Sequence, residues 1–590
     1  MNQKVSVMKR LNEKFRILKN HKLFDAKDFN KRSAKHGYGW RNEGIRSEIK
    51  DDYILILNIV NANPQYSFFY YSELASDDRL GGGGFNDQLM QAEDLMLNTG
   101  STMYTQFYQD RYKGVFRANM AIETLGNCKG VTEEALNQYK GEAYFLRAYY
   151  YYELASMFGN IPCPISSVAD PTLPQISGEP LWGQILQDLM AAIKLMPAKA
   201  QMGTGHVDKY CAQALLGRAY LFYSGFYNDE TVTCPDGTEI TKQNVIDEIN
   251  DCVANSGYSL VPNYYNLWAY TNRCTVNDEL SAYKGKGLVW VENDYGTNPE
   301  AMFMVKYNTQ PSWSTTIGYV NGYALHFGVR GGQDYAKTFP FGQGWGAGPV
   351  APNLYSDWNA AEPNDPRRDA SIQKVNDLPG YSYGAGGWND FAQETDYLQK
   401  KIMPVVARKD DGTSFWASFS NAMDPNLTWS SGNEDNFQLN SINDMVLIRF
   451  AEVLLMQSEL TGDATGMNKV RARAGLPAVA YSVEALRNER RWELAFEGVR
   501  WNDLRRYGDD YAKTALDKQN NVNIYLSGTP GKNNVSSING GYGSRYTQTK
   551  GFAPLPTDQI SLSAQAGEQY KFKQNEGWGT TDSEYGGWPR

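Results

Sequence analysis

The sequence predicts a mainly α-helical protein in which about four helical hairpins of the tetratricopeptide repeat (TPR) type support a large, loop-rich region. Helical periodicity of apolar residues runs through 47–227 and returns at 442–508. Between these stretches, 228–441 is rich in Gly, Asn, Pro and aromatic residues, and 509–590 is again loop-like. A chain of 590 residues exceeds the usual size of one hydrophobic core, so it forms either several domains or one large composite fold.

Three early stretches predict the first hairpins, at 104–127, 140–158 and 210–228. Each carries apolar and aromatic residues at helical spacing, and the third adds small residues at Ala212 and Gly217. Small residues at a helix crossing allow close approach, and aromatic residues fill the groove opposite them. This is how TPR hairpins stack, so we expect three early units.

The central stretch, 228–441, predicts the loop-rich region. Long loops in a compact protein are usually functional or disordered, and the high aromatic content argues against disorder. We therefore expect an ordered, loop-built face that lies over the helical scaffold.

The late stretch predicts one more hairpin and one charged helix. Apolar residues recur at helical spacing in its first part, namely Val446, Phe450, Val453 and Leu454. A second helix from about Gly466 ends at Gly475, because Pro477 follows. A third begins at Ser482, two residues before Glu484, as a capped helix does.

Composition excludes several classes of function. The net charge of −9 gives a nucleic-acid role no electrostatic support and favours a neutral ligand. Six cysteines without a CxxC pair, together with four His, indicate no zinc site and leave disulfides open. The glycine run 81–84 lacks the following GK[ST] of a phosphate loop, so we interpret it as a flexible loop. Structural calcium at the acidic segment 410–412 stays possible, although no cofactor is indicated.

The N-terminal 46 residues form a separate basic segment. They are rich in Lys and Arg and contain no apolar h-region of a signal peptide. The longest apolar run, 53–60, is far too short for a membrane helix.

Three motifs in the late region carry a family resemblance: RFAEVLLMQSEL, NKVRARAGLP and ERRWELAFEGVRWNDLRRYG. They resemble the C-terminal signature of the SusD/RagB family of outer-membrane nutrient-binding lipoproteins of Bacteroidetes. The resemblance covers about 47–590 and implies a single SusD-like composite domain. We interpret the charges of the last motif as scaffold, because Glu489, Glu493 and Glu497 are spaced four apart among arginines.

The resemblance implies non-catalytic binding of a glycan at the cell surface. It also implies delivery of the glycan to a SusC-like TonB-dependent transporter in the outer membrane. Family members are anchored there by an N-terminal lipid, whose cysteine is not visible in this sequence. The basic segment 1–46 resembles nothing in the family.

Site residues follow from the chemistry of sugars, whose rings stack on flat aromatic faces while planar polar groups bind their hydroxyls. By position in the family pattern, the candidate ligand-binding residues are Asp77, Asp78, Arg79, Trp268, Trp313, Tyr319, Arg330 and Trp345. Trp313, between Ser and Thr, is the best candidate for an exposed platform, and Arg330 for a polar clamp. Trp345, in a GWG run, has the more structural character.

Three alternatives stay open. The chain could be a peptide-binding member of the same family. A glycoside hydrolase would need one pair of carboxyl groups, and no pattern singles out such a pair among 66 acidic residues. A TPR-type interaction protein would bind its partner in the scaffold grooves, so changes to loop aromatics would leave binding intact.

Overall fold

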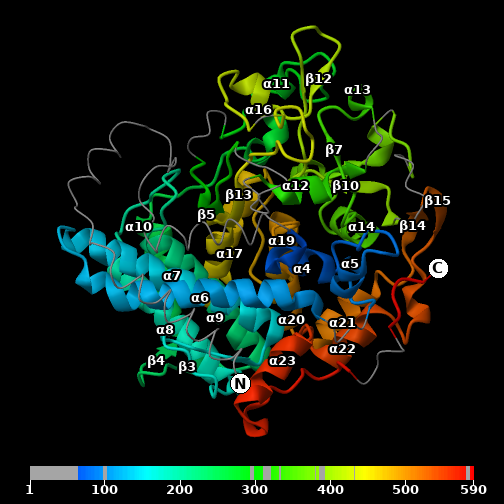
Figure 1. Ribbon diagram of the computed structural model, residues 1–590. Helices are drawn as coiled ribbons and strands as arrows, with labels where there is room; N and C mark the ends of the chain where they lie inside the picture. The colour runs from blue at the N-terminus through cyan, green and yellow to red at the C-terminus, as the bar shows by residue number, and fades with distance from the viewer. Residues whose placement is uncertain are drawn as a thin grey trace.

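The computed structural model describes residues 64–97, 102–292, 298–309, 320–330, 334–378, 380–384, 393–430, 432–579 and 585–589. The basic segment 1–46, the helix expected after residue 47, Trp313 and Tyr319 lie outside these ranges. Within them the protein is mainly α-helical, with a helical scaffold on one side and a loop-built region above it (Figure 1).

Five consecutive helices build the early scaffold. They are α6 (Thr105–Thr124), α7 (Glu133–Phe158), α8 (Glu179–Leu195), α9 (Lys209–Tyr227) and α10 (Lys242–Asn255). Each packs against the next in sequence, so the layer is a stack of hairpins (Figure 1). Ordinary capping signals set their ends: Asp208 accepts the Tyr210 and Cys211 N–H groups at the start of α9, and Gly159 follows α7 with a φ of 68°.

The late helices complete this layer. They are α17 (Phe450–Thr461), α18 (Thr465–Arg473), α19 (Val483–Leu494), α20 (Arg500–Arg506) and α21 (Asp509–Asp517). Helix α17 packs against α10 as well as α18, so the late hairpin continues the early stack across the loop-rich region. Ser482 caps α19 by accepting the Ala485 N–H, as the sequence predicted.

Two boundaries differ from the sequence-based expectation. Helix α10 lies inside 228–441, so the scaffold extends beyond residue 227. Val446 belongs to strand β13 (Met445–Arg449) and not to the helix that follows, because β13 pairs with β5 (Ala301–Val305), which is remote in sequence.

The loop-built region contains short helices and small sheets of two or three strands in its described part. Its elements include α12 (Gly322–Phe327), β6 (Val329–Arg330), β7 (Gln343–Gly344), α14 (Pro352–Ala361), β8 (Ile372–Lys374), β9 (Gln393–Glu394), β10 (Tyr397–Gln399), β11 (Ala407–Arg408) and β12 (Phe415–Trp416). Strand β9 joins the C-terminal hairpin of β14 (Asn523–Leu526) and β15 (Thr529–Lys532) in the order β15-β14-β9.

The N-terminal helix α4 (Phe68–Ala75) lies in the main core between the scaffold and the loop-built region (Figure 1). The glycine run that follows it is buried and packed, so its interpretation as a flexible loop was wrong. A Cβ on Gly82 would lie 2.5 Å from Cδ of Pro349, and its φ is 84°. Close backbone approach therefore explains the glycine at this position.

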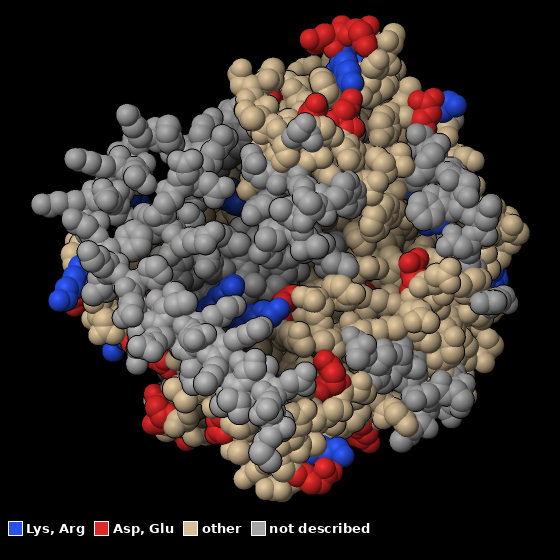
Figure 2. Space-filling model, in the orientation of Figure 1, with Lys and Arg blue, Asp and Glu red and all other residues tan. Residues whose placement is uncertain are grey.

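No helix among the described residues combines the length and apolarity needed to span a bilayer. All six cysteines are free. On the face shown in Figure 2, the charged side chains of described residues are scattered in small groups of both signs.

Candidate functional site

The signature helix α19 and Glu497, three residues after its end, supply carboxylates to a buried network of ion pairs. Their basic partners come from four separate segments and are Arg367, Lys401, Arg449, Arg471 and Arg473. Glu493 is fully buried and lies 2.9 Å from the Arg367 guanidinium. Burial raises the pKa of Glu493, but the surrounding arginines outweigh it and hold that pKa well below its usual value. The interpretation of these charges as scaffold is confirmed.

Asp77 and Asp78 belong to the same scaffold. Both are buried, and Arg500 binds Asp77 through two hydrogen bonds of 2.7 and 2.9 Å. Arg491 lies 3.0 Å from Asp77 and 2.8 Å from Asp78. Burial alone would raise the pKa of Asp77, but the two arginines lower it to about 2. Arginines of α19 and α20 bind both oxygens of Asp77 and Oδ1 of Asp78, so the structure places these two predicted site residues in the buried scaffold.

Arg79, another predicted site residue, is also fully buried. Its guanidinium pairs with Glu73 and donates to the carbonyl of Gly348 at 2.7 Å. The rings of Phe327 and Phe496 lie 4.1 and 4.7 Å from it. Arg79 therefore connects α4 to the loop-built region.

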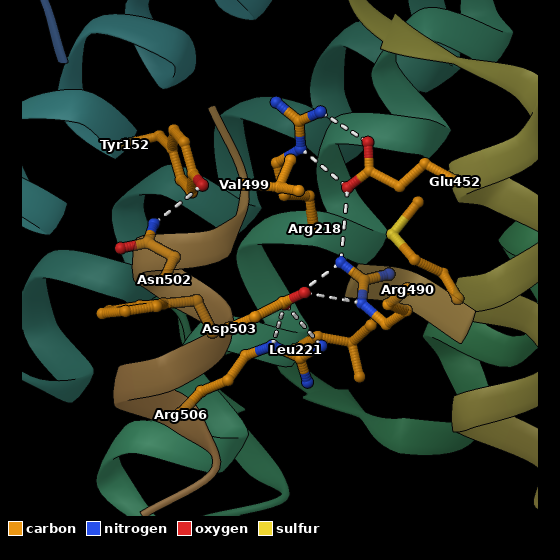
Figure 3. A pocket seen from close by; sticks show the side chains of 11 residues that line it. Tyr152, Arg218, Leu221, Glu452, Arg490, Val499, Asn502, Asp503 and Arg506 are labelled. Atoms are coloured by element: carbon orange, nitrogen blue, oxygen red, sulfur yellow. Dashed lines mark hydrogen bonds and ion pairs between the residues drawn. The ribbon is translucent and has the colours of Figure 1, made fainter. Parts of the chain in front are cut away.

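A cavity of about 10 Å³ lies between α9, α17, α19 and α20 (Figure 3). It is lined by Tyr152, Arg218, Leu221, Phe222, Glu452, Met456, Arg490, Val499, Asn502, Asp503 and Arg506. Its polar groups largely satisfy one another, as in the 2.9 Å pair of Arg490 with Asp503 (Figure 3). Space of this size holds about one water molecule, so the cavity is too small for a sugar or peptide.

Trp268 is half-buried within the loop-built region. Its ring contacts Tyr264 edge-on at 5.5 Å, and the Lys401 ammonium lies 4.8 Å from its centre. The indole N–H is buried and has no hydrogen-bond partner. These contacts indicate a plug between loop and scaffold, so Trp268 does not join the other candidates.

Trp345 is half-buried and rests on α12. Its ring centre lies 4.6 Å from that of His326, and its backbone N–H donates to the Leu325 carbonyl at 2.8 Å. Burial lowers the pKa of His326 to about 3, so the imidazole is neutral at physiological pH. His326 in turn contacts the Tyr70 hydroxyl of α4 at 3.3 Å. A rigid support of this kind can hold an indole ring as a binding platform.

Arg330 lies beside this platform. Its guanidinium donates to the Trp345 carbonyl at 3.2 Å, and β6 pairs with β7 so that Arg330 is opposite Gly344. A Cβ on Gly344 would lie 2.4 Å from the Leu325 carbonyl oxygen, so glycine permits this close packing. The structure thus brings Arg330 and Trp345 together.

A second cavity, of about 20 Å³, opens beside Arg330. It is lined by Phe327, Gly328, Arg330, Gly346, Ala347, Gly348, Pro349, Tyr381, Glu394, Thr395, Leu398 and Gln399. A cavity of this volume holds a water molecule and not a whole sugar ring. It forms a small depression, lined by both polar and apolar residues, at the edge of the platform.

Sequence reasoning missed the tyrosines next to this depression. Tyr381 donates to Glu394 at 2.7 Å and Tyr383 donates to Asp396 at 2.6 Å. Tyr383 stacks on Tyr525, with ring centres 3.6 Å apart. The alternation of tyrosines in a glycine-rich stretch was a weak signal for the first two, whereas nothing near Tyr525 in the sequence indicated the pair.

The acidic segment 410–412 forms a tight turn. Asp411 accepts the N–H groups of Thr413 and Ser414 at 2.8 and 2.7 Å, and these bonds lower its pKa. Within the described ranges, no group of three or more His, Cys, Asp or Glu side chains is arranged to hold a metal ion.

The fold and the buried signature define a helical-repeat scaffold that presents a loop-built face. A model described as "SusD family" matches residues 286–578, and one described as "Starch-binding associating with outer membrane" matches 46–221. SusD-like protein P2 of Formosa agariphila is 24% identical over 495 residues, which is 78% of this chain and 84% of that protein. The chain belongs to the SusD family.

Solved structures show the same fold. A laminarin binding SusD-like protein superposes with a TM-score of 0.63 at 23% identity, covering 91% of this chain and 100% of that one. Surface glycan-binding protein A from Bacteroides fluxus gives 0.64 at 23% identity, over 90% and 98%. The Bacteroides thetaiotaomicron protein in complex with laminarihexaose gives 0.62 at 18% identity, over 89% and 98%.

Proposed function

We propose that this protein is a non-catalytic receptor that binds an oligosaccharide on its loop-built face, with Trp345 as the stacking platform. The observation that carries the proposal is the partly exposed Trp345, whose ring lies against that of His326 at an angle of 54° and whose backbone carbonyl accepts from the buried Arg330. A fixed aromatic face next to planar polar groups matches what a sugar ring requires.

Family membership supports the same proposal. Two solved relatives are described as laminarin-binding and as a complex with laminarihexaose, so sugar binding is compatible with this fold. By analogy with the family, the receptor acts at the outer surface of the outer membrane and passes its ligand to a SusC-like TonB-dependent transporter. Trp313 and Tyr319 stay predicted contributors to the site.

Stacking on one indole gives modest affinity. Burial of about 100 Å² at 25 cal/mol per Å² contributes roughly 2 kcal/mol before entropy, so we expect dissociation constants in the µM-to-mM range. Many weak sites on one polymer then raise the effective affinity.

Calorimetric titration tests the proposal directly. We would titrate the protein with malto-, cello- and laminarihexaose, and assay reducing ends in the same samples. Saturable binding without release of sugar, weakened about tenfold or more by Trp345→Ala, is the expected result. Tyr511→Ala, a half-buried tyrosine of α21 far from the platform in sequence, is the control and should bind normally.

Other outcomes would redirect the assignment. Release of reducing ends would show a glycoside hydrolase. If no sugar binds, and peptide mixtures bind in a way that Trp345→Ala abolishes, the protein is a peptide-binding member of the family. Normal binding by Trp345→Ala and loss by Trp313→Ala would move the platform to Trp313.

A further inference from the structure

The depression beside Arg330 separates two aromatic surfaces. Gly346, the neighbour of Trp345, lines it, and so do Tyr381 and Glu394. Tyr381 lies edge-on to Tyr383 at 5.4 Å between ring centres. The small cavity therefore links the neighbour of Trp345 to Tyr381, and the ring contact links Tyr381 to Tyr383.

Stacking, strand pairing and a hydrogen bond fix the positions of Tyr383 and Tyr525. Tyr383 and Tyr525 stack with an angle of 10° between their planes, although one lies in a loop and the other in β14. Register pairing places Tyr525 opposite Glu394 of β9. Glu394 also accepts the Gly384 N–H at 2.7 Å, which fixes the loop that carries Tyr383. All three tyrosines stay partly exposed.

We propose that Tyr383 and Tyr525 form a second sugar-binding subsite, which extends the Trp345 site across the depression so that one oligosaccharide occupies both. This inference rests on the proposed function. A stacked pair presents a flat aromatic face, and the Tyr383 hydroxyl is already anchored by Asp396, while the neighbouring Tyr381 hydroxyl is anchored by Glu394.

The charges of the second subsite indicate the class of sugar. Asp396 is half-buried and keeps acceptor capacity for a sugar hydroxyl beside its bond from Tyr383, whereas Glu394 is buried and both its oxygens already accept hydrogen bonds. Two carboxylates would repel uronate or sulfate groups, so the subsite fits a neutral oligosaccharide. The small cavity between the subsites has room for water or one exocyclic group and not for a ring.

Sugars of different length distinguish the contributions of the two subsites to binding. We would measure binding of disaccharides and hexasaccharides of the malto, cello and laminari series to wild type, Trp345→Ala, Tyr525→Ala and Tyr383→Ala. Tyr525→Ala and Tyr383→Ala should weaken the hexasaccharide about tenfold and leave the disaccharide unchanged. Trp345→Ala should weaken both ligands.

Conservative variants guard against simple misfolding. Tyr383→Phe keeps the stacked ring and loses only the hydroxyl bonded to Asp396, so hexasaccharide binding should stay within about threefold of wild type. Tyr511→Ala provides a tyrosine truncation elsewhere. Thermal unfolding of every variant is recorded, and the hexasaccharide-to-disaccharide affinity ratio is compared because misfolding lowers both affinities together.

The binding results distinguish an error in the second subsite from an error in the proposed function. If hexasaccharide binding depends on Trp345 but is unaffected by both tyrosine truncations, the second subsite is wrong and the receptor assignment stands. If neither sugar length binds to the wild-type protein, both are overturned. Preference for oligogalacturonate over every neutral hexasaccharide would overturn the neutral-sugar assignment of the subsite.

Discussion

Arg500 donates two hydrogen bonds to Asp77, of 2.7 and 2.9 Å, although the two residues are 423 positions apart in the sequence. The contact joins the end of the first described helical segment to α20, and both side chains are buried. An ion pair of this kind stabilises a fold mainly because removal of one partner leaves the other charge buried alone.

Substitution Asp77→Asn should therefore destabilise the protein strongly. We expect a loss of about 3–5 kcal/mol in the free energy of unfolding, because Arg500 loses its nearest carboxylate and Arg491 loses one of its carboxylate partners. Urea denaturation followed by tryptophan fluorescence measures it. Lys571→Met, which breaks the exposed pair with Glu568, is the control and should change the same quantity by less than about 1 kcal/mol. Equal effects of the two changes would contradict the scaffold role.

Lys400 should lower the free energy of unfolding near neutral pH. It is buried against the rings of Tyr270 and Tyr283, and burial lowers the pKa of its amine to about 7. The unfolded chain holds that proton up to about pH 10, so stability should rise as pH increases from about 7 toward 10. Lys400→Met should remove this rise and add roughly 2–4 kcal/mol to the free energy of unfolding at pH 7. Parallel pH profiles for the variant and wild type would refute this.

Glu93 presents the opposite sign of pH dependence. Its side chain is fully buried, neither carboxyl oxygen has a hydrogen-bond partner, and burial raises its pKa well above the usual value. The unfolded chain releases the proton near pH 4.5, so the folded state loses stability as pH rises from there toward the folded pKa. The stability advantage of Glu93→Gln over wild type should grow by about 1.4 kcal/mol per pH unit. Denaturation midpoints at pH 5, 6 and 7 provide the measurement, and a constant difference would count against it.

His326 should position Trp345 without contacting the ligand. His326→Ala removes the ring whose centre lies 4.6 Å from that of the indole, so Trp345 should become mobile and its near-UV circular dichroism should fall. His326→Phe keeps a flat ring and should preserve most of the signal. Because burial lowers the His326 pKa to about 3, the wild-type signal should not change between pH 5 and 8. Subtraction of the Trp345→Ala spectrum isolates the indole, and an unchanged His326→Ala spectrum would show that His326 gives no support.

Local sequence predicted the regular part of the fold well. Helical spacing and the Ser482 cap located α19, and the spacing of Glu489, Glu493 and Glu497 correctly indicated scaffold. It failed at Val446, where pairing with the remote strand β5 overrides a helical pattern. It also failed for the glycine run, because packing against Pro349 is invisible in a local pattern.

By itself, the sequence determined the helical class, the family and the approximate position of the loop-built region, because periodicity, caps and signature motifs are local properties. Only the tertiary structure decided which candidate residues lie in the buried ion-pair scaffold and which lie next to Trp345. Asp77 and Arg330 are both polar residues near aromatic segments, yet one is consumed by ion pairs with α19 and α20 and the other lies beside Trp345. Burial depends on partners that lie tens to hundreds of residues away, and a single sequence does not name those partners.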